Sequence, residues 1–197
     1  MSWLHEWQDL QGTRLFLGPL NHEIQIYDLD PSISTSRSRE KFALQRIIED
    51  KYPELVITKD VHGKPYFPQK ELHINYSHSA THLFWGEHEK YAIGVDVEIA
   101  RIQLQRVAHK YCNETELNYT DNGVNTALLV AIWSAKEAMF KAYGKGAIDF
   151  RTDMQISPFT VQEEGTLIGF FGAGINVSLN ISYRRFNNMI CTWVLWV

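Results

Sequence analysis

The chain carries the stretch WSAKEAMFKAYGKG at residues 133–146. Apolar side chains recur here at helical spacing and a glycine follows Tyr143, which predicts the end of a long helix over residues 124–143. Glu137 and Lys141 stand four residues apart and therefore share one face of this helix. An acid and a base in this arrangement can hold a metal ion beside a phosphate group.

Each half of the sequence is predicted to contain a helix followed by short strands. The first helix begins near Ser36 or Ser38 and ends before Pro53, and a short helix at residues 103–111 precedes the long one. The expected extended segments are 13–30, 55–58, 72–77, 83–86, 91–98, 154–157, 167–171, 177–183 and 189–197.

This repeated order predicts an α+β fold. We expect two similar halves, each a helix packed on a small antiparallel sheet, related by a pseudo-twofold axis. Residues 1–100 would form the N-terminal half and residues 101–197 the C-terminal half. No Pro/Gly linker separates them, so we expect one compact unit with the site at a tight interface.

The composition describes a chain with a sizeable core and little net charge. The 197 residues are 45% hydrophobic and carry a net charge of −4, which argues against binding nucleic acid through bulk charge. No apolar run approaches the roughly 20 residues of a membrane-spanning helix. The first residues lack the features of a secretory signal peptide, so we expect a cytoplasmic protein. Cys112 and Cys191 follow no metal or disulfide spacing, which favours reduced, buried thiols.

Two further acids stand in the expected strand at Gly94-Val95-Asp96-Val97-Glu98. Asp96 and Glu98 point to one face, while the valines point into a core. At a separation of about 6.6 Å, the two charges repel by about 2.5 kcal/mol at an effective dielectric near 20. A divalent cation such as Mg²⁺ would offset that repulsion. The alternative is a solvated strand end, just as Glu137 and Lys141 could form a surface salt bridge.

Other polar groups could bind phosphate. Ser77 and His78 lie between two strand candidates and offer a hydroxyl and an imidazole; the alternative is a structural turn. Lys64 follows Gly63 in a turn, and Arg46 belongs to a basic run on the first helix whose default interpretation is a solvated face. No Walker A sequence or Rossmann glycine pattern occurs in the chain.

The order of these motifs resembles the 4′-phosphopantetheinyl transferase superfamily. A basic helix is followed by Gly-Lys-Pro at 63–65, Ser-His-Ser at 77–79, Gly-Val-Asp-Val-Glu at 94–98 and WSAKEAMFKAYGKG at 133–146. The resemblance spans residues 36–146. The length and doubled architecture resemble the long, monomeric branch that includes the surfactin-type synthetase activators, rather than the short trimeric branch.

The resemblance implies specific roles for the acids and for Lys141. Members move the phosphopantetheine arm of coenzyme A onto a serine of an apo acyl or peptidyl carrier protein and release 3′,5′-ADP. Asp96, Glu98 and Glu137 would hold Mg²⁺, or Mn²⁺, against the pyrophosphate. Lys141 would bind phosphate and stabilise the leaving group. Glu137 would also deprotonate the carrier serine, directly or through a metal-bound water.

The resemblance also implies the coenzyme A contacts. Ser77 and His78 would contact its phosphates, and Lys64 and Arg46 would bind the end that carries the 3′-phosphate and adenosine. Arg39 is the alternative to Arg46 for that role. A further acidic residue of the family pattern corresponds to either Glu116 or Glu114. Basic side chains after the Asp96 strand would dock the acidic carrier; these are Arg101, Arg106 and Lys110.

Two other functions use the same residues. One is a homologue that binds coenzyme A or a carrier without transferring anything. The other is a Mg²⁺-dependent pyrophosphohydrolase that directs the same acids at water.

Overall fold

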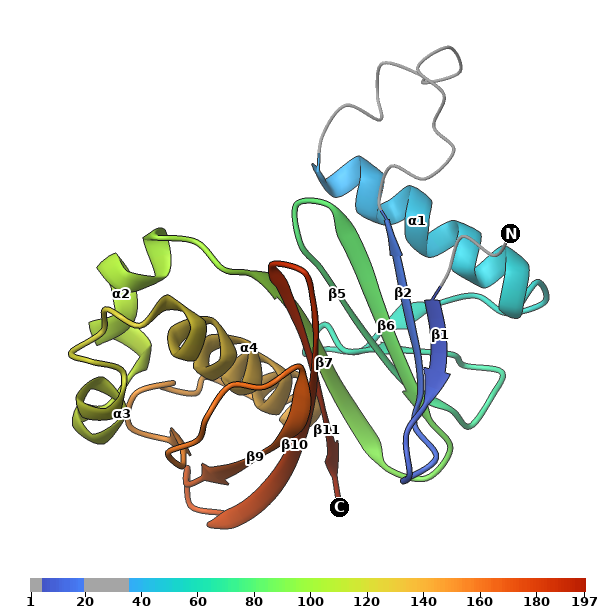
Figure 1. Ribbon diagram of the computed structural model, residues 1–197. Helices are drawn as coiled ribbons and strands as arrows, with labels where there is room; N and C mark the ends of the chain where they lie inside the picture. The colour runs from blue at the N-terminus through green and yellow to red at the C-terminus, as the bar shows by residue number, and fades with distance from the viewer. Residues whose placement is uncertain (1–4, 20–35) are drawn as a thin grey trace.

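The computed structural model describes residues 5–19 and 36–197, and its strands form two antiparallel sheets (Figure 1). The first sheet has the strand order β1-β2-β6-β5-β4-β3, and the second has the order β7-β11-β10-β9-β8. The first-sheet strands are β1 (His5–Gln8), β2 (Arg14–Pro19), β3 (Thr58–Lys59), β4 (Pro65–Tyr66), β5 (His73–His78) and β6 (His82–His88). The second-sheet strands are β7 (Ala92–Ile99), β8 (Met154–Ile156), β9 (Glu164–Phe171), β10 (Val177–Phe186) and β11 (Met189–Trp196).

The helices lie on the outer faces of the two sheets, so the molecule has four layers (Figure 1). Helix α1 (Ser36–Lys51) covers the outer face of the first sheet, where Ala43 and Ile47 pack against Trp85. The inner faces of the two sheets pack against each other through residues such as Phe84 and Val95. The remaining helices are α2 (Gln103–Tyr111), α3 (Glu114–Tyr119) and α4 (Thr126–Tyr143).

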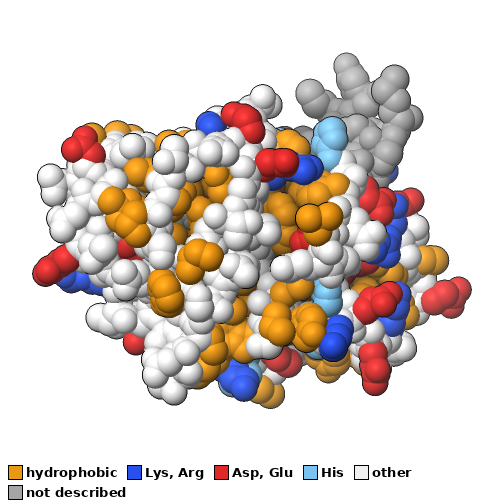
Figure 2. Space-filling view, turned by 60° about the horizontal axis from the view of Figure 1, so that its bottom comes forward, with side chains coloured by type: hydrophobic (Ala, Val, Ile, Leu, Met, Phe, Trp, Pro, Cys, Tyr) orange, Lys and Arg blue, Asp and Glu red, His pale blue; other side chains and the backbone are white. Residues whose placement is uncertain are grey.

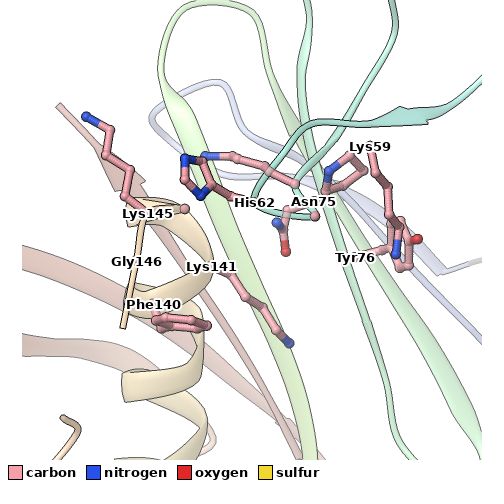
Figure 3. A pocket seen from close by; sticks show the side chains of 12 residues that line it. Lys59, His62, Asn75, Tyr76, Phe140, Lys141, Lys145 and Gly146 are labelled. Carbon is pink, nitrogen blue, oxygen red and sulfur yellow. The ribbon is translucent and has the colours of Figure 1, made fainter. Parts of the chain in front are cut away.

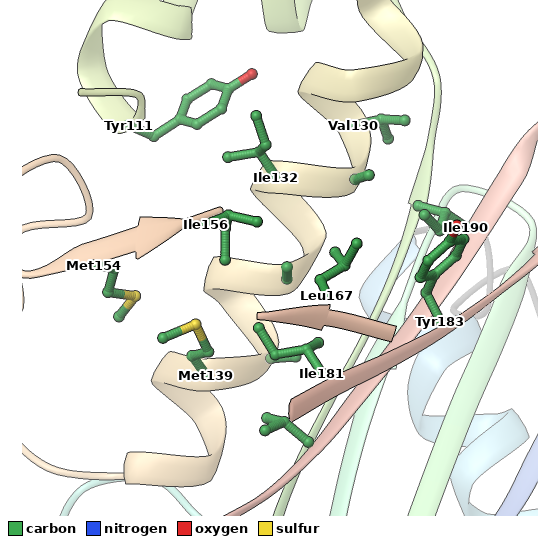
Figure 4. Packing of buried hydrophobic residues seen from close by; sticks show 14 of the residues in the cluster. Tyr111, Val130, Ile132, Met139, Met154, Ile156, Leu167, Ile181, Tyr183 and Ile190 are labelled. Carbon is green, nitrogen blue, oxygen red and sulfur yellow. The ribbon is translucent and has the colours of Figure 1, made fainter. Parts of the chain in front are cut away.

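Helix α4 is the centre of the largest hydrophobic cluster (Figure 4). Its apolar side chains, such as Met139, are packed among Met154 of β8, Leu167 of β9 and Ile181 of β10. These residues are almost completely buried. At about 1.5–3 kcal/mol for each fully buried large apolar side chain, this contact fixes α4 on the second sheet.

Strand β7 joins the two sheets and brings α4 close to β5. It contacts α4, β11, β5 and β6. Gly94 allows the closest approach, since a Cβ atom there would overlap the carbonyl oxygen of Ala138 and the backbone nitrogen of Ala142. Because both obstacles are helix backbone, only glycine fits at this crossing. Asp96, the next residue of β7 on the same face as Gly94, therefore lies against α4.

The structure confirms the expected α+β class and most of the expected helices and strands. The pseudo-twofold relation between two halves stays a prediction. Strands β1 and β4 and helix α3 were missed. Helix α3 begins with a capping box, in which Asn113 accepts a hydrogen bond from the backbone of Glu116 and the Glu116 side chain accepts one from the backbone of Asn113. The change of sheet occurs at residues 89–91, between β6 and β7. The division at residue 100 stays a prediction.

Some expectations fall outside the described residues. These include residues 20–30 of the extended segment expected at 13–30 and the side chains of Ser36 and Ser38. Within the described ranges, none of the helices combines the length and apolar character needed to cross a membrane. Acidic and basic side chains are interspersed on the face shown in Figure 2, with fewer of either over the C-terminal half.

Candidate active site

Three polar side chains from three elements meet at the edge of β7. The Lys141 ammonium group on α4 donates to Asp96 Oδ1 on β7 at 2.7 Å and to Ser77 Oγ on β5 at 2.9 Å. Ser77 Oγ also donates to Asp96 Oδ1 at 2.8 Å. Asp96 is only 4% exposed, which rejects the alternative of a solvated strand end. The structure thus brings Asp96, Lys141 and Ser77 together, and their roles stay predictions.

The close packing of the backbone brings these three side chains together. Gly94 lets β7 pack closely against α4, and Asp96 follows two residues later on the same face. On the other side, the buried Asn75 side chain accepts a hydrogen bond from the backbone of Val95 at 3.4 Å, which ties β7 to β5. Ser77 stands two residues beyond Asn75 and therefore faces the same way.

Glu137 and Glu98 complete an acidic cluster around Asp96. Burial raises the pKa of Glu137 to about 7; the charges of Asp96 and Glu98 also raise it, whereas Lys141 opposes the shift. Burial likewise raises the pKa of Glu98, followed by repulsion from Asp96. The Trp133 side chain hydrogen-bonds to Glu98 and opposes that shift. The charge of Asp96 therefore acts on both Glu137 and Glu98, and the cluster would gain from a cation.

The side chains of Asp96, Glu98 and Glu137 offer the type of ligand that a divalent cation such as Mg²⁺ prefers. All three groups are carboxylates, the oxygen ligands that this ion prefers. Asp96 Oδ2 is buried and has no hydrogen-bond partner among the described residues. As they stand, however, no three His, Cys, Asp or Glu side chains in the described ranges are arranged closely enough to hold a metal ion. Lys141 provides the positive charge beside Asp96 in this arrangement.

A pocket of about 420 Å³ opens beside Lys141 (Figure 3). Lys141 reaches into it from α4, Lys59 and Tyr76 lie on the side away from that helix, and Lys145 and His62 also line it. Among the described residues, four lysines line the pocket: Lys59, Lys64, Lys141 and Lys145. Several cations around one hollow favour a ligand with more than one phosphate group.

Lys64 links the turn before β4 to the end of α4. Its turn is fixed by Asp60, whose side chain accepts hydrogen bonds from the backbone of His62 and of Lys64. The Lys64 ammonium group then donates to the carbonyl oxygen of Ala142 at 2.9 Å, in the last turn of α4. A cation there satisfies a helix-terminal carbonyl and complements the helix dipole. Burial lowers the pKa of Lys64.

His78 and Arg46 are placed differently from Ser77. Adjacent strand residues point to opposite faces, so His78 turns toward α1, where its Nδ1 lies 3.3 Å from Glu40 Oε2. Arg46 is partly buried on α1. Neither occurs among the described residues that line the lysine pocket. Their roles toward coenzyme A stay predictions. The stretch around Ser77, expected between strands, belongs to β5 as far as His78.

Lys136 of α4 is completely buried, although a lysine side chain is normally solvated. It is 0% exposed. Its ammonium group donates to Glu116 Oε2 at 2.6 Å and to the carbonyl oxygens of Tyr111 and Phe150 at 2.7 and 2.8 Å. Glu116 is also 0% exposed and accepts from the backbone of Ile156. In this structure Glu116 anchors α3 to α4, while Glu114 is exposed.

Sequence reasoning missed three residues of the site. Lys59 at the end of β3 and Lys145 after α4 line the pocket, yet a single lysine gives no signal of its own. Asn75 lies two residues before Ser77, and its spacing along a strand could have placed it on the same face. Cys112 and Cys191 are free and buried, as expected.

Comparison with known proteins supports the two motifs at 94–98 and 133–146. The model of the 4′-phosphopantetheinyl transferase superfamily matches residues 92–191, which include β7, α4, β8, β9, β10 and the start of β11. A comparison with curated proteins gave no match. The family match covers Asp96, Glu98, Glu137 and Lys141 and spans more than half of the chain. The chain therefore belongs to the 4′-phosphopantetheinyl transferase superfamily.

Proposed function

We propose that this protein transfers the 4′-phosphopantetheine arm of coenzyme A to a serine of an apo acyl or peptidyl carrier protein, a reaction of the holo-acyl-carrier-protein synthase type. The observation that carries the proposal is the junction of an acidic cluster with a lysine pocket. Lys141 belongs to both, because it pairs with Asp96 and lines the pocket. The superfamily match supports transferase chemistry at this junction.

The reaction forms a bond between the serine Oγ and the phosphorus next to pantetheine. The bond from that phosphorus to the leaving 3′,5′-ADP oxygen breaks, and the serine proton passes to a base. Glu137 suits this role because burial raises its pKa to about 7, which matches proton transfer near neutral pH. Lys141 would stabilise the charge that develops on the leaving phosphate.

The lysine pocket would hold the other phosphates of coenzyme A. Lys59, Lys64 and Lys145 surround a volume that suits a nucleotide-sized group. Ser77 and His78 would contact phosphate as the resemblance implies, and Arg46 would support the 3′-phosphate. We expect substitution of Arg46 to raise the KM for coenzyme A and to leave kcat largely unchanged.

Asp96, Glu98 and Glu137 would hold Mg²⁺ or Mn²⁺. When bound, the ion supplies charge neutralisation at the pyrophosphate. Burial and mutual repulsion of these acids support the assignment. Glu98 is held by Trp133 and by Arg101, whose guanidinium lies 3.4 Å from it.

The acceptor would approach from the side of α2. There a groove contains Glu137 on one wall and apolar residues such as Trp133 and Phe150 on the others. Lys110 lines this groove, and the exposed Arg106 lies on the same helix, α2. These cations suit an acidic carrier.

The test is mass spectrometry of several apo carriers incubated with coenzyme A and Mg²⁺. Transfer adds one phosphopantetheine group to the carrier serine and releases 3′,5′-ADP. Coenzyme A binding without carrier modification would indicate a non-catalytic homologue. Release of free phosphopantetheine in the absence of a carrier would indicate a pyrophosphohydrolase.

A further inference from the structure

We propose that Lys141 is a built-in counter-ion of Asp96 that competes with the divalent cation. In this view the ammonium group must leave Asp96 before a metal ion binds there, and a phosphate in the lysine pocket draws it away. The inference rests on the proposed function, since it concerns the metal and phosphate of the same site.

The Lys141 ammonium group donates to only one of the two oxygens of the Asp96 carboxylate. Oδ1 accepts from Lys141 at 2.7 Å and from Ser77 at 2.8 Å. Oδ2 is buried, and no described residue donates to it. A carboxylate that is 4% exposed needs a positive partner, because burying a lone charge is costly. Lys141 meets that need at Oδ1, while Oδ2 stays without a donor.

The arrangement around Lys141 allows an exchange of partners. Its side chain is 24% exposed and lines the pocket that also contains Lys59, Lys64 and Lys145. A phosphate held by these lysines would attract the Lys141 ammonium group at short range. An ammonium group and a divalent cation on the same buried carboxylate repel each other strongly. The phosphate and the metal therefore favour the same movement of Lys141.

The carboxylate geometry is consistent with this competition. In the described part of the chain, Asp96, Glu98 and Glu137 are not drawn together into a three-ligand metal site. Glu137 and Glu98 nevertheless interact electrostatically with Asp96. Release of Lys141 would leave Asp96 and Glu137 without this cation and so increase the affinity of the acidic cluster for a divalent ion.

The test is calorimetric titration of the free protein with Mn²⁺, without coenzyme A. Lys141→Met should bind Mn²⁺ at least about tenfold more tightly than the wild type, within the range typical of coupled sites. Lys141→Arg keeps the charge and should bind as weakly as the wild type. Lys70→Met removes an exposed lysine elsewhere and serves as the matched control.

Two further measurements keep the proposal falsifiable. Circular dichroism shows whether each variant is folded, and Asp96→Asn in the Lys141→Met background should abolish the gained affinity. Equal Mn²⁺ affinity of the wild type and folded Lys141→Met would overturn the counter-ion role, as would a gain that survives Asp96→Asn. Transfer by the wild type is measured separately, so either idea can fail alone.

Discussion

Replacing Lys136 by Met should destabilise the protein without removing a catalytic group. The change deletes an ammonium group that donates to Glu116 and to the carbonyl oxygens of Tyr111 and Phe150, all in a buried region. Removing one partner of a buried ion pair costs about 3–5 kcal/mol, which for a chain of this length lowers Tm by about 6–20 °C. Thermal and urea denaturation would measure the loss.

A double substitution separates the unpaired charge from the lost packing. Adding Glu116→Gln to Lys136→Met removes the charge left behind and should restore part of the stability, so the two changes are not additive. Lys145→Met, at an exposed site, should stay within about 0.5 kcal/mol of the wild type. If Lys136→Met melts like the wild type, the buried pair does not contribute as argued.

Three other outcomes follow from the packing and charges of the site. Gly94→Ala should lower the free energy of unfolding by about 3 kcal/mol or more, because its Cβ meets helix backbone, whereas Gly172→Ala meets only ordinary contacts; equal urea midpoints would contradict this. Because folding raises the pKa of Glu137 to about 7, its contribution to the stability of the metal-free protein should decrease as pH rises from about 4.5 to 7. Comparison of denaturation curves with Glu137→Gln isolates this pH dependence, which that variant should lack. Reversing the charges of Arg106 and Lys110 together should raise the KM for the carrier and leave coenzyme A affinity unchanged; an unaltered carrier KM would refute the docking surface.

The sequence predicted the elements that have strong local periodicity. Residues 103–111 match α2, and the long helix begins only two residues later than expected, at Thr126. Strand β1 was missed because four residues give little pattern, and its pairing with β2 is a tertiary contact. Helix α3 was missed although Asn113 and Glu116 have capping-box spacing, a signal that could have revealed it.

The candidate site was predictable in residue type but not in pairing. Spacing placed Glu137 and Lys141 on one helix face and Asp96 and Glu98 on one strand face. It could not show that Lys141 pairs with Asp96, because that contact depends on how closely Gly94 lets β7 approach α4. For the same reason the sequence could not distinguish the buried Lys136 from an exposed lysine. Both answers depend on packing between distant segments.

The most direct test of the proposed site is the effect of replacing Glu137 on the rate of transfer. Single-turnover transfer from coenzyme A to an apo carrier should be measured for Glu137→Gln at saturating Mg²⁺. We predict that the single-turnover rate constant falls on the order of 10²-fold or more, because the variant loses both the base and a metal ligand. Glu114→Gln, at an exposed position of α3, should transfer at the normal rate. Near-normal turnover by Glu137→Gln would contradict the assignment of this acidic cluster as the catalytic centre.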